Sequence, residues 1–388
     1  MLWRKAKRKD RGKRQTLGTS LRMEVLESRA MLTGVATVEV VDGSLVIKAL
    51  NDDDTKVEIT QDVTGSSTYF VKGVDGTLVN GLSGKQEFTG VNKDIDARFK
   101  DGQDEIKLKT GVEVHRDLLV KGGEKVDTVI LQSDVVVGRD VNLKMGKNSD
   151  VVDLKGNNDI GRDLIVKGDN GSDEVKITDA TIGRNVNLNL GKGDNVVKID
   201  PTEIDKNLTV KSTGTLDLEL DATTVKGKTN ITGGGSDDDV TIKNGSDLQG
   251  DVNINLKNGY NDVVIKESEL GSKFNYRGGN DMDTMAIDDA DFGGKVTIAT
   301  RGGTDNVEIE RSGSLTGKSN FNGTTDIDLG KGDSDVLKIG KGDGDTRAKF
   351  FADLYLDGGA GFLDELNLLG NGNDIMAGLM IDRFEVIS

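Results

Sequence analysis

The sequence predicts an all-β fold, a parallel β-solenoid that is capped at both ends and that we expect to be a right-handed β-helix. The first observation is a repeat: short apolar pairs recur about every 22–23 residues from residue 92 onwards. Repeats of this length mark stacked architectures. The second observation is the composition, with 52 Gly, 1 Pro, 34% hydrophobic and 4% aromatic residues in a chain of 388. One compact core would be poorly supplied, whereas each coil of a solenoid buries only a thin column of aliphatic side chains.

The repeated unit is clearest at residues 161–182, GRDLIVKGDNGSDEVKITDATI. Leu164 and Val166 form one apolar pair and Val175 and Ile177 a second, each with the spacing of two that a strand with one buried face requires. A single apolar residue, here Ile182, stands just before the next unit. These three apolar columns keep their register over ten steps, which predicts coils that stack directly on one another.

Residues 1–34 are predicted to be a basic leader or targeting segment without a fixed structure. Residues 1–22 hold nine Lys or Arg and one Asp, although the whole chain has a net charge of −16. Residues 20–34, SLRMEVLESRAMLTG, resemble the LEPR-XLL segment of large surface proteins of planctomycete bacteria, through Leu26, Glu27, Arg29 and Leu32. Ser28 departs from that pattern, because the family has Pro there. The resemblance implies an exported protein located outside the cell or at its surface.

Residues 35–91 alternate apolar and polar residues in strand fashion and are predicted to form an irregular β cap. The pair Asp42-Gly43 indicates a hairpin within it. Residues 92–388 are predicted to form the solenoid, with irregular coils after Thr316. The apolar ending is predicted to be a C-terminal cap in which Phe384, Val386 and Ile387 cover the last coil.

Charge and composition narrow the possible partners. After the leader, the remainder of the chain is strongly acidic, so we expect no nucleic acid partner. The chain has no cysteine, which excludes disulfides and thiolate metal sites. No run reaches the roughly 18 apolar residues of a membrane span, so no transmembrane segment is expected.

One polar position recurs two residues before the second apolar pair of each coil, and it is nearly always Asp or Asn. Glycines often precede it, as in GDNGSDEVKI (168–177) and GKGDNVVKI (191–199). This pattern resembles the Gly-x-Gly-x-Asp turn of RTX-type calcium-binding repeats, and the resemblance implies a calcium site. A hard cation requires six or more oxygens, and glycine allows carbonyl groups to converge. The predicted metal ligands are Asp104, Asp127, Asp150, Asp173, Asn195, Asp238, Asn261, Asp283, Asp305 and Asp374.

The pattern also departs from RTX repeats. Those recur about every nine residues, whereas here one such turn occurs in each coil, and Leu216 interrupts the column. The alternative is that Gly, Asn and Asp simply make tight turns. Both interpretations remain open from the sequence.

Catalysis finds little support. His115 is the only histidine and the chain has no cysteine, which excludes thiol–histidine catalysis and histidine-rich zinc sites. Arg139, Arg162 and Arg184 form a column that a polysaccharide lyase or hydrolase could use, but no aromatic cluster accompanies it. The sequence therefore predicts a non-enzymatic structural, adhesive or matrix protein, with calcium, envelope or extracellular polysaccharide, or other surface proteins as partners. The alternative is a carbohydrate-active β-helix.

Overall fold

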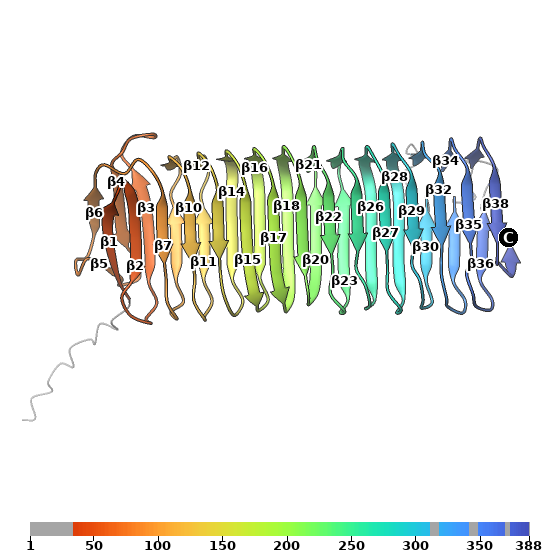
Figure 1. Cartoon of the computed structure of the whole chain (residues 1–388), viewed down its shortest axis with the longest axis horizontal. Coiled ribbons are helices and arrows are strands. Elements are labelled where there is room, and N and C mark those ends of the chain that lie inside the picture. Colours follow the sequence, from red (N-terminus) through yellow and green to blue (C-terminus); the bar gives the residue numbers. More distant parts are fainter. Residues whose placement is uncertain (1–33, 311–317, 341–347, 369–372, 388) are drawn as a thin grey trace, which may run out of the picture. The chain divides into compact units, whose positions relative to one another are not determined.

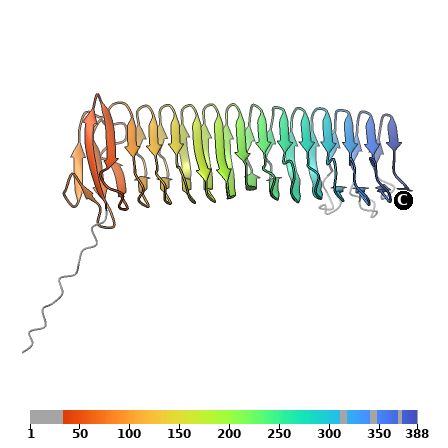
Figure 2. The same cartoon turned by 60° about the horizontal axis from the view of Figure 1, so that its bottom comes forward.

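The computed structural model describes residues 34–310, 318–340, 348–368 and 373–387. In these residues the chain forms strands and turns, and the described part contains no helix. Equivalent strands of successive coils run parallel to one another in two sheets along the stack, which confirms the predicted β-solenoid (Figures 1 and 2). The basic leader and the LEPR-XLL-like segment lie outside the described residues, apart from Gly34.

The first sheet contains the strands that begin each coil. They are β1 (Val35–Val41), β2 (Ser44–Ala49), β5 (Leu78–Val79), β7 (Ile95–Arg98), β10 (Leu118–Lys121), β13 (Val141–Lys144), β15 (Leu164–Asn170), β17 (Val186–Lys192), β19 (Leu208–Ser212), β22 (Thr229–Thr232), β25 (Val252–Asn255), β27 (Phe274–Arg277), β29 (Val296–Ala299), β32 (Thr325–Asp328), β35 (Leu354–Asp357) and β38 (Leu379–Asp382).

The second sheet contains the strands that complete each coil. They are β3 (Lys56–Gln61), β4 (Tyr69–Gly73), β6 (Lys85–Phe88), β8 (Glu105–Leu108), β9 (Glu113–Val114), β11 (Thr128–Leu131), β12 (Val136–Val137), β14 (Val151–Ile160), β16 (Glu174–Ile182), β18 (Asp194–Ile204), β20 (Thr215–Asp221), β21 (Thr224–Val225), β23 (Asp238–Lys243), β24 (Asp247–Leu248), β26 (Asn261–Leu270), β28 (Asp283–Phe292), β30 (Asn306–Ile309), β31 (Asn320–Phe321), β33 (Val336–Ile339), β34 (Lys349–Phe350), β36 (Glu365–Leu368), β37 (Asp374–Ile375) and β39 (Val386–Ile387).

One coil shows the path of the chain. From β10 it passes through residues 122–127, which we call the aspartate turn, into β11 of the second sheet. It changes direction at residues 132–135, the bend, where Asp134 has a φ of 61°. After β12 it returns through residues 138–140, the arginine corner, to β13. β13 pairs parallel with β10, so each strand lies directly on its counterpart in the previous coil.

The three apolar columns predicted from the sequence fill the interior. Leu164, Val166, Val175, Ile177 and Ile182 of the central unit are all buried, with at most 1% of their surface exposed. Inward and outward residues alternate because successive side chains of a strand point to opposite faces. The core is thus a continuous stack of aliphatic layers.

The N-terminal section joins the stack as well as covering it. β1 and β2 form an antiparallel hairpin through Asp42 and Gly43, as predicted, and both turn residues have positive φ. β2 pairs parallel with β7 and β3 with β8, so these two strands belong to the first coil. β4 and β6 add antiparallel strands beyond β3. Such strands cover an edge that would otherwise present unpaired main-chain groups.

The C-terminal coils take in more residues but keep the same strand pairing. The hydrogen bond between the equivalent residues Asp305 and Asp335 spans 30 positions, against 23 between Asp127 and Asp150. The extra residues 311–317 and 341–347 lie outside the described part of the chain.

The predicted C-terminal cap forms one more coil. β38 pairs with β35 and β39 with β36. Phe384 packs partly against the core, but Val386 and Ile387 are 44% and 59% exposed and do not cover it as expected. The reason is that β38 and β39 form the last of the described coils, so no further described coil packs on them.

Phenylalanines stack along one column of the C-terminal half. The rings of Phe292 and Phe321 are stacked with centroids 4.8 Å apart, and those of Phe321 and Phe350 with centroids 4.6 Å apart. These distances match the strand spacing of about 4.8 Å. The stack spans the longer coils, so it holds the register where the repeat length changes.

Candidate functional site

The repeated Asp and Asn residues form a buried column in the aspartate turns. Nine of the ten predicted ligands, from Asp104 to Asp305, are in it, and none of the nine is more than 3% exposed. Asp335 and Asp364 continue the column, each also fully buried. The sequence signal for these two was present, because each stands two residues before an aliphatic pair. Asp374 lies elsewhere, in β37, where it is partly exposed and 3.9 Å from Lys349 Nζ.

Each carboxylate of the column except that of Asp283 accepts a main-chain hydrogen bond from the preceding coil, and Oδ1 of Asp283 accepts from the side-chain amide of Asn261 at 2.7 Å instead. The N–H of Asp104 donates to Oδ1 of Asp127 at 3.1 Å, and that of Asp127 to Oδ1 of Asp150 at 2.7 Å. The N–H of Asp150 donates to Oδ1 of Asp173 at 3.0 Å. The same bond recurs at Asp305, whose N–H donates to Oδ1 of Asp335 at 2.7 Å. These buried N–H groups lie just before the second-sheet strands, and a buried N–H without a partner is costly. The column therefore ties each turn to its neighbour.

Glycine residues of the same turn shape the other side of the carboxylate. The N–H of Gly123 donates to Oδ2 of Asp127 at 2.7 Å. In another coil, a Cβ added to Gly168 would lie 1.9 Å from Oδ2 of Asp173 and 2.5 Å from the carbonyl oxygen of Leu190. The carboxylate is therefore packed against main chain that carries no side chain. This close approach explains a glycine five residues before Asp in several coils.

Burial raises the pKa of these carboxyl groups far above the ordinary value for Asp. The pKa values lie between about 6 and about 8, highest at Asp150. Removal from water is the main cause, since it penalises the charged form, and neighbouring carboxylates add to it. The residues concerned are Asp104, Asp127, Asp150, Asp173, Asp238, Asp283 and Asp335. Near neutral pH the members with the highest pKa, such as Asp150, therefore hold a proton.

Several carboxylates keep one oxygen without a hydrogen-bond partner. Oδ2 has none in Asp104, Asp150, Asp173, Asp305, Asp335 and Asp364. A buried charged oxygen without a partner is unfavourable. A proton on that oxygen removes the charge, in agreement with the raised pKa values.

Leu216 interrupts the column where the strands are longer. Asn195 and Leu216 pair as strand residues, because β18 begins at Asp194 and β20 at Thr215. The N–H of Leu216 still donates to Oδ1 of Asp238 at 2.8 Å. A leucine is tolerated here because Asn195, its counterpart in the preceding coil, has its main chain paired within the sheet and needs no carboxylate as a partner.

A second column of Asp and Asn residues at the arginine corner was not anticipated from the sequence. The N–H of Asp140 donates to Oδ1 of Asp117 at 3.1 Å, and that of Asp163 to Oδ1 of Asp140 at 3.1 Å. These bonds point toward the preceding coil, opposite in direction to those of the aspartate turn. The signal was an Asp or Asn directly before the first apolar pair.

The arginine column noted in the sequence lies beside these residues. Nε of Arg139 is 3.6 Å from Oδ1 of Asp117, and Nε of Arg162 is 3.7 Å from Oδ1 of Asp140. Both guanidinium side chains are more than a third exposed. Exposed pairs of this kind contribute at most about 1 kcal/mol each. The arginines therefore pair with carboxylates of the neighbouring coil along the corner.

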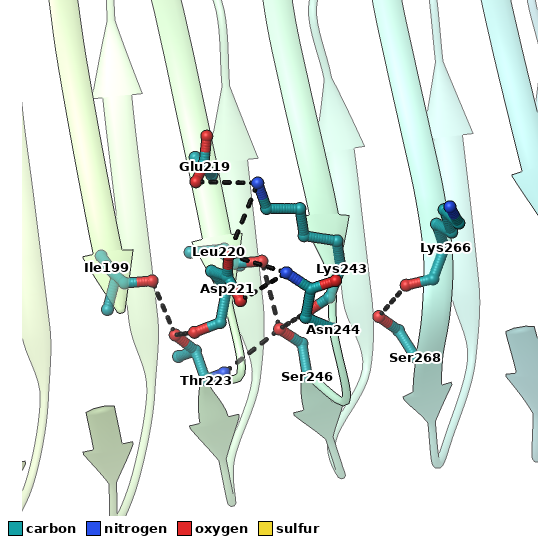
Figure 3. A network of polar contacts seen from close by, with 10 residues as sticks. All are labelled: Ile199, Glu219, Leu220, Asp221, Thr223, Lys243, Asn244, Ser246, Lys266 and Ser268. Carbon is teal, nitrogen blue, oxygen red and sulfur yellow. Dashed lines mark hydrogen bonds and ion pairs between the residues drawn. The ribbon is translucent and has the colours of Figure 1, made fainter. Parts of the chain in front are cut away.

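The bend carries a third column, of Ser, Thr and Asn. Figure 3 shows it at Thr223 and Ser246. The Thr223 hydroxyl donates to the carbonyl of Ile199 at 2.9 Å, and the Thr223 N–H donates to Oγ of Ser246 at 3.1 Å. Outside the bend, Lys243 Nζ lies 3.0 Å from Glu219. Where the bend carries Ser, Thr or Asn, side-chain oxygens thus connect it from coil to coil, as they do in the two turns.

The fit of the aspartate turn to calcium can be judged from its oxygens. Oδ1 is occupied by a main-chain N–H in most members, and Oδ2 is buried against the turn. Calcium requires six to eight oxygens at 2.3–2.6 Å. Among the described residues, no three Asp, Glu or His side chains lie together as a group that could hold a metal. The geometry favours the structural interpretation of the column, and calcium binding stays a prediction.

The fold and its turns define the class of this protein as a parallel β-solenoid with side-chain ladders at its corners. Comparison of the chain with known protein families, with curated proteins and with solved structures gave no match. In the described part of the chain no helix is long and apolar enough to cross a membrane.

Proposed function

We propose that this protein is a non-enzymatic structural rod that works outside the cell or at its surface, as a spacer or an adhesive scaffold. The observation that carries the proposal is the coil-to-coil connection of both turns and the bend by side-chain oxygens, as between Asp127 and Asp150. The polar side chains that repeat most regularly form hydrogen bonds between successive coils and so stabilise the stack. A continuous parallel stack of this kind suits a spacer, a protein that keeps whatever is bound at its two ends a fixed distance apart.

The outer face of the first sheet supports the adhesive part of this proposal. The Asn253 side chain donates to the amide oxygen of Asn230 at 3.1 Å, and Asn275 donates to Asn253 at 2.9 Å. Side-chain amides carry both donors and acceptors. A row of them along the rod offers repeated hydrogen bonds to a polymer that lies on this face.

The experiment for the enzymatic alternative is a turnover assay of the full chain on acidic and neutral polysaccharides. Lyase action is followed by ultraviolet absorbance of unsaturated products, and hydrolysis by new reducing ends. We expect no product above a heat-denatured control. Product formation that is lost in an Arg139→Ala/Arg162→Ala variant would favour the carbohydrate-active alternative instead.

The location is tested by cell fractionation of the source organism with an antibody against the chain. The proposal expects the protein in the envelope or medium fraction, and recovery with cytoplasmic markers contradicts it. Images of single purified particles test the rod itself: we expect straight particles of one length. Particles that bend at a constant point contradict the spacer role.

Calcium is the competing candidate for neutralising the aspartate turns. It is favoured by the unpartnered Oδ2 atoms of residues such as Asp150 and Asp173. Protons and calcium neutralise the same oxygens, so they compete, and calcium uptake releases protons. Their effects on stability therefore differ with pH, so melting at two pH values with and without calcium distinguishes them.

A further inference from the structure

Three lysines stand in one row on the outer face of the first sheet. Lys121 pairs in register with Lys144, and Lys144 with Lys167, in β10, β13 and β15. All three side chains are exposed. Neighbouring strands are about 4.8 Å apart, so three ammonium groups follow one another along the rod at that spacing. Like charges directly opposite each other on a sheet are destabilising.

In the described part of the chain, the three lysines of the row lack the ion pairs that neighbouring lysines form. On the second sheet, Lys155 is 3.0 Å from Asp153, and Lys147 beside the row is 2.6 Å from Glu124. Within the described residues, no carboxylate forms an ion pair with Lys121, Lys144 or Lys167. An unpaired positive row is unexpected on a chain with a net charge of −16. The arrangement has an electrostatic cost that an anionic partner removes.

The row borders two adjoining grooves with volumes of about 570 and 220 Å³. Lys121 and Lys144 line both, and Lys167 lines the larger. Main chain at Gly122 and Gly146 forms part of the larger groove, so no side chain obstructs the approach there. Carboxylates also line it, at Asp52, Asp101, Glu124 and Asp169. These carboxylates limit the net attraction of the groove for anions, and they favour an anionic ligand whose charges lie along the lysine row.

We propose that this row binds a linear acidic polysaccharide, with one carboxylate on each sugar, that lies along the rod. A polyuronate presents carboxylates at regular steps of about one sugar ring, comparable with the spacing of the coils. A DNA strand in a duplex carries a charge every 3.4 Å and does not match this row. Phe99, the one aromatic residue of the larger groove, is only 6% exposed, so bases find no stacking platform there.

The inference deepens the proposed function, because it names the partner of the adhesive rod and assumes that the polymer is bound and not cleaved. Release of product would contradict the non-enzymatic function and leave the binding site standing. Loss of binding with intact rods would remove the polymer site and leave the spacer role standing.

The test is binding of the full chain to polygalacturonate at low ionic strength, measured by calorimetry, with dextran as the neutral polymer and oligothymidylate as the nucleic acid. The test variant is Lys121→Gln/Lys144→Gln/Lys167→Gln. The matched control is Lys198→Gln/Lys206→Gln/Lys273→Gln, which removes three exposed lysines from elsewhere on the rod. We expect the test variant to lose at least about tenfold in affinity, or about 1.4 kcal/mol, and the control to lose less than about twofold. Binding should also weaken as salt is added.

Equal loss in both variants, equal binding of dextran, or tighter binding of oligothymidylate overturns the proposal. So does self-association that the test variant abolishes while the chain binds no polymer, because a second copy is then the occupant. Melting of both variants is the folding control, and relief of repulsion should leave the test variant at least as stable as the parent. If the triple variant does not fold, Lys144→Gln alone decides, with Lys198→Gln as its control.

Discussion

The main-chain N–H of Asp150 donates a 3.0 Å hydrogen bond to Oδ1 of Asp173, the equivalent residue one coil further on. The carboxyl group that accepts this bond is buried, and its pKa is raised to about 6. The bond needs an acceptor oxygen but no negative charge. An amide can therefore replace the carboxylate, and the chain uses Asn at positions 195 and 261 of the same column.

Two substitutions of Asp150 distinguish the role of its hydrogen-bond acceptor oxygen from the role of its negative charge. Asp150→Ala leaves the buried N–H of Asp127 without its 2.7 Å partner, and we expect a loss of about 1–3 kcal/mol in the free energy of unfolding. Asp150→Asn keeps an acceptor oxygen and removes a buried charge, so at pH 8 we expect no loss of stability. Denaturant unfolding of both variants measures this. If both variants lose the same amount, the charge itself is needed.

The pH dependence of stability should run opposite to that of a protein with surface carboxylates. The pKa is about 7 for Asp104 and about 8 for Asp150 in the folded chain, against about 3.9 when unfolded. Between pH 4 and pH 8 the folded state therefore binds more protons, and stability falls as pH rises. We expect a lower melting temperature at pH 8 than at pH 5. A variant with Asn at Asp104, Asp150 and Asp238 should show a smaller difference, and an unchanged slope would contradict the assignment.

Two glycines provide a matched pair of substitutions. A Cβ on Gly168 would lie 1.9 Å from Asp173 Oδ2, whereas one on Gly235 meets no atom within 4 Å. We expect Gly168→Ala to destabilise by about 1–3 kcal/mol, because the carboxylate must move. Gly235→Ala should be neutral or stabilise by up to about 1 kcal/mol through the unfolded chain. Thermal unfolding compares them, and similar effects of the two would mean that the close packing of Asp173 is not important.

The phenylalanine stack gives a test of the longer coils. Phe321 is fully buried between Phe292 and Phe350. Phe321→Ala should cost about 3–5 kcal/mol, and Phe321→Leu less because it leaves a smaller cavity. Limited proteolysis locates the effect: we expect new cuts after residue 292 and protection of the coils before it. Uniform sensitivity along the chain would show that the longer coils do not depend on this stack.

Much of the fold could be predicted from the sequence, because each coil repeats its buried aliphatic pairs at a constant spacing, as at Leu164 and Val166. Residues such as Asp335 and Asp364 were harder to recognise, since insertions change the spacing between coils there. The role of the aspartate turn could not be predicted, because Gly and Asp are equally typical of exposed turns, and burial of Asp173 depends on Gly168 and on the neighbouring coil.

The two other ladders were hidden for a different reason. The corner column begins with Asp residues and continues with Asn185 and Asn207, while the bend alternates between small polar and apolar residues such as Thr223 and Ala290. Their common feature is a position in space. That position becomes visible only once the coils are stacked.

The central claim is that the aspartate turns are structural ladders that are neutralised by protons. It is tested most directly by melting the protein at pH 5 and pH 8, each with calcium and with a chelator. The claim predicts a higher melting temperature at pH 5 and no difference between calcium and chelator at either pH. A melting temperature at pH 8 that rises with calcium, with release of protons in the parent but not in Asp150→Asn, would contradict it.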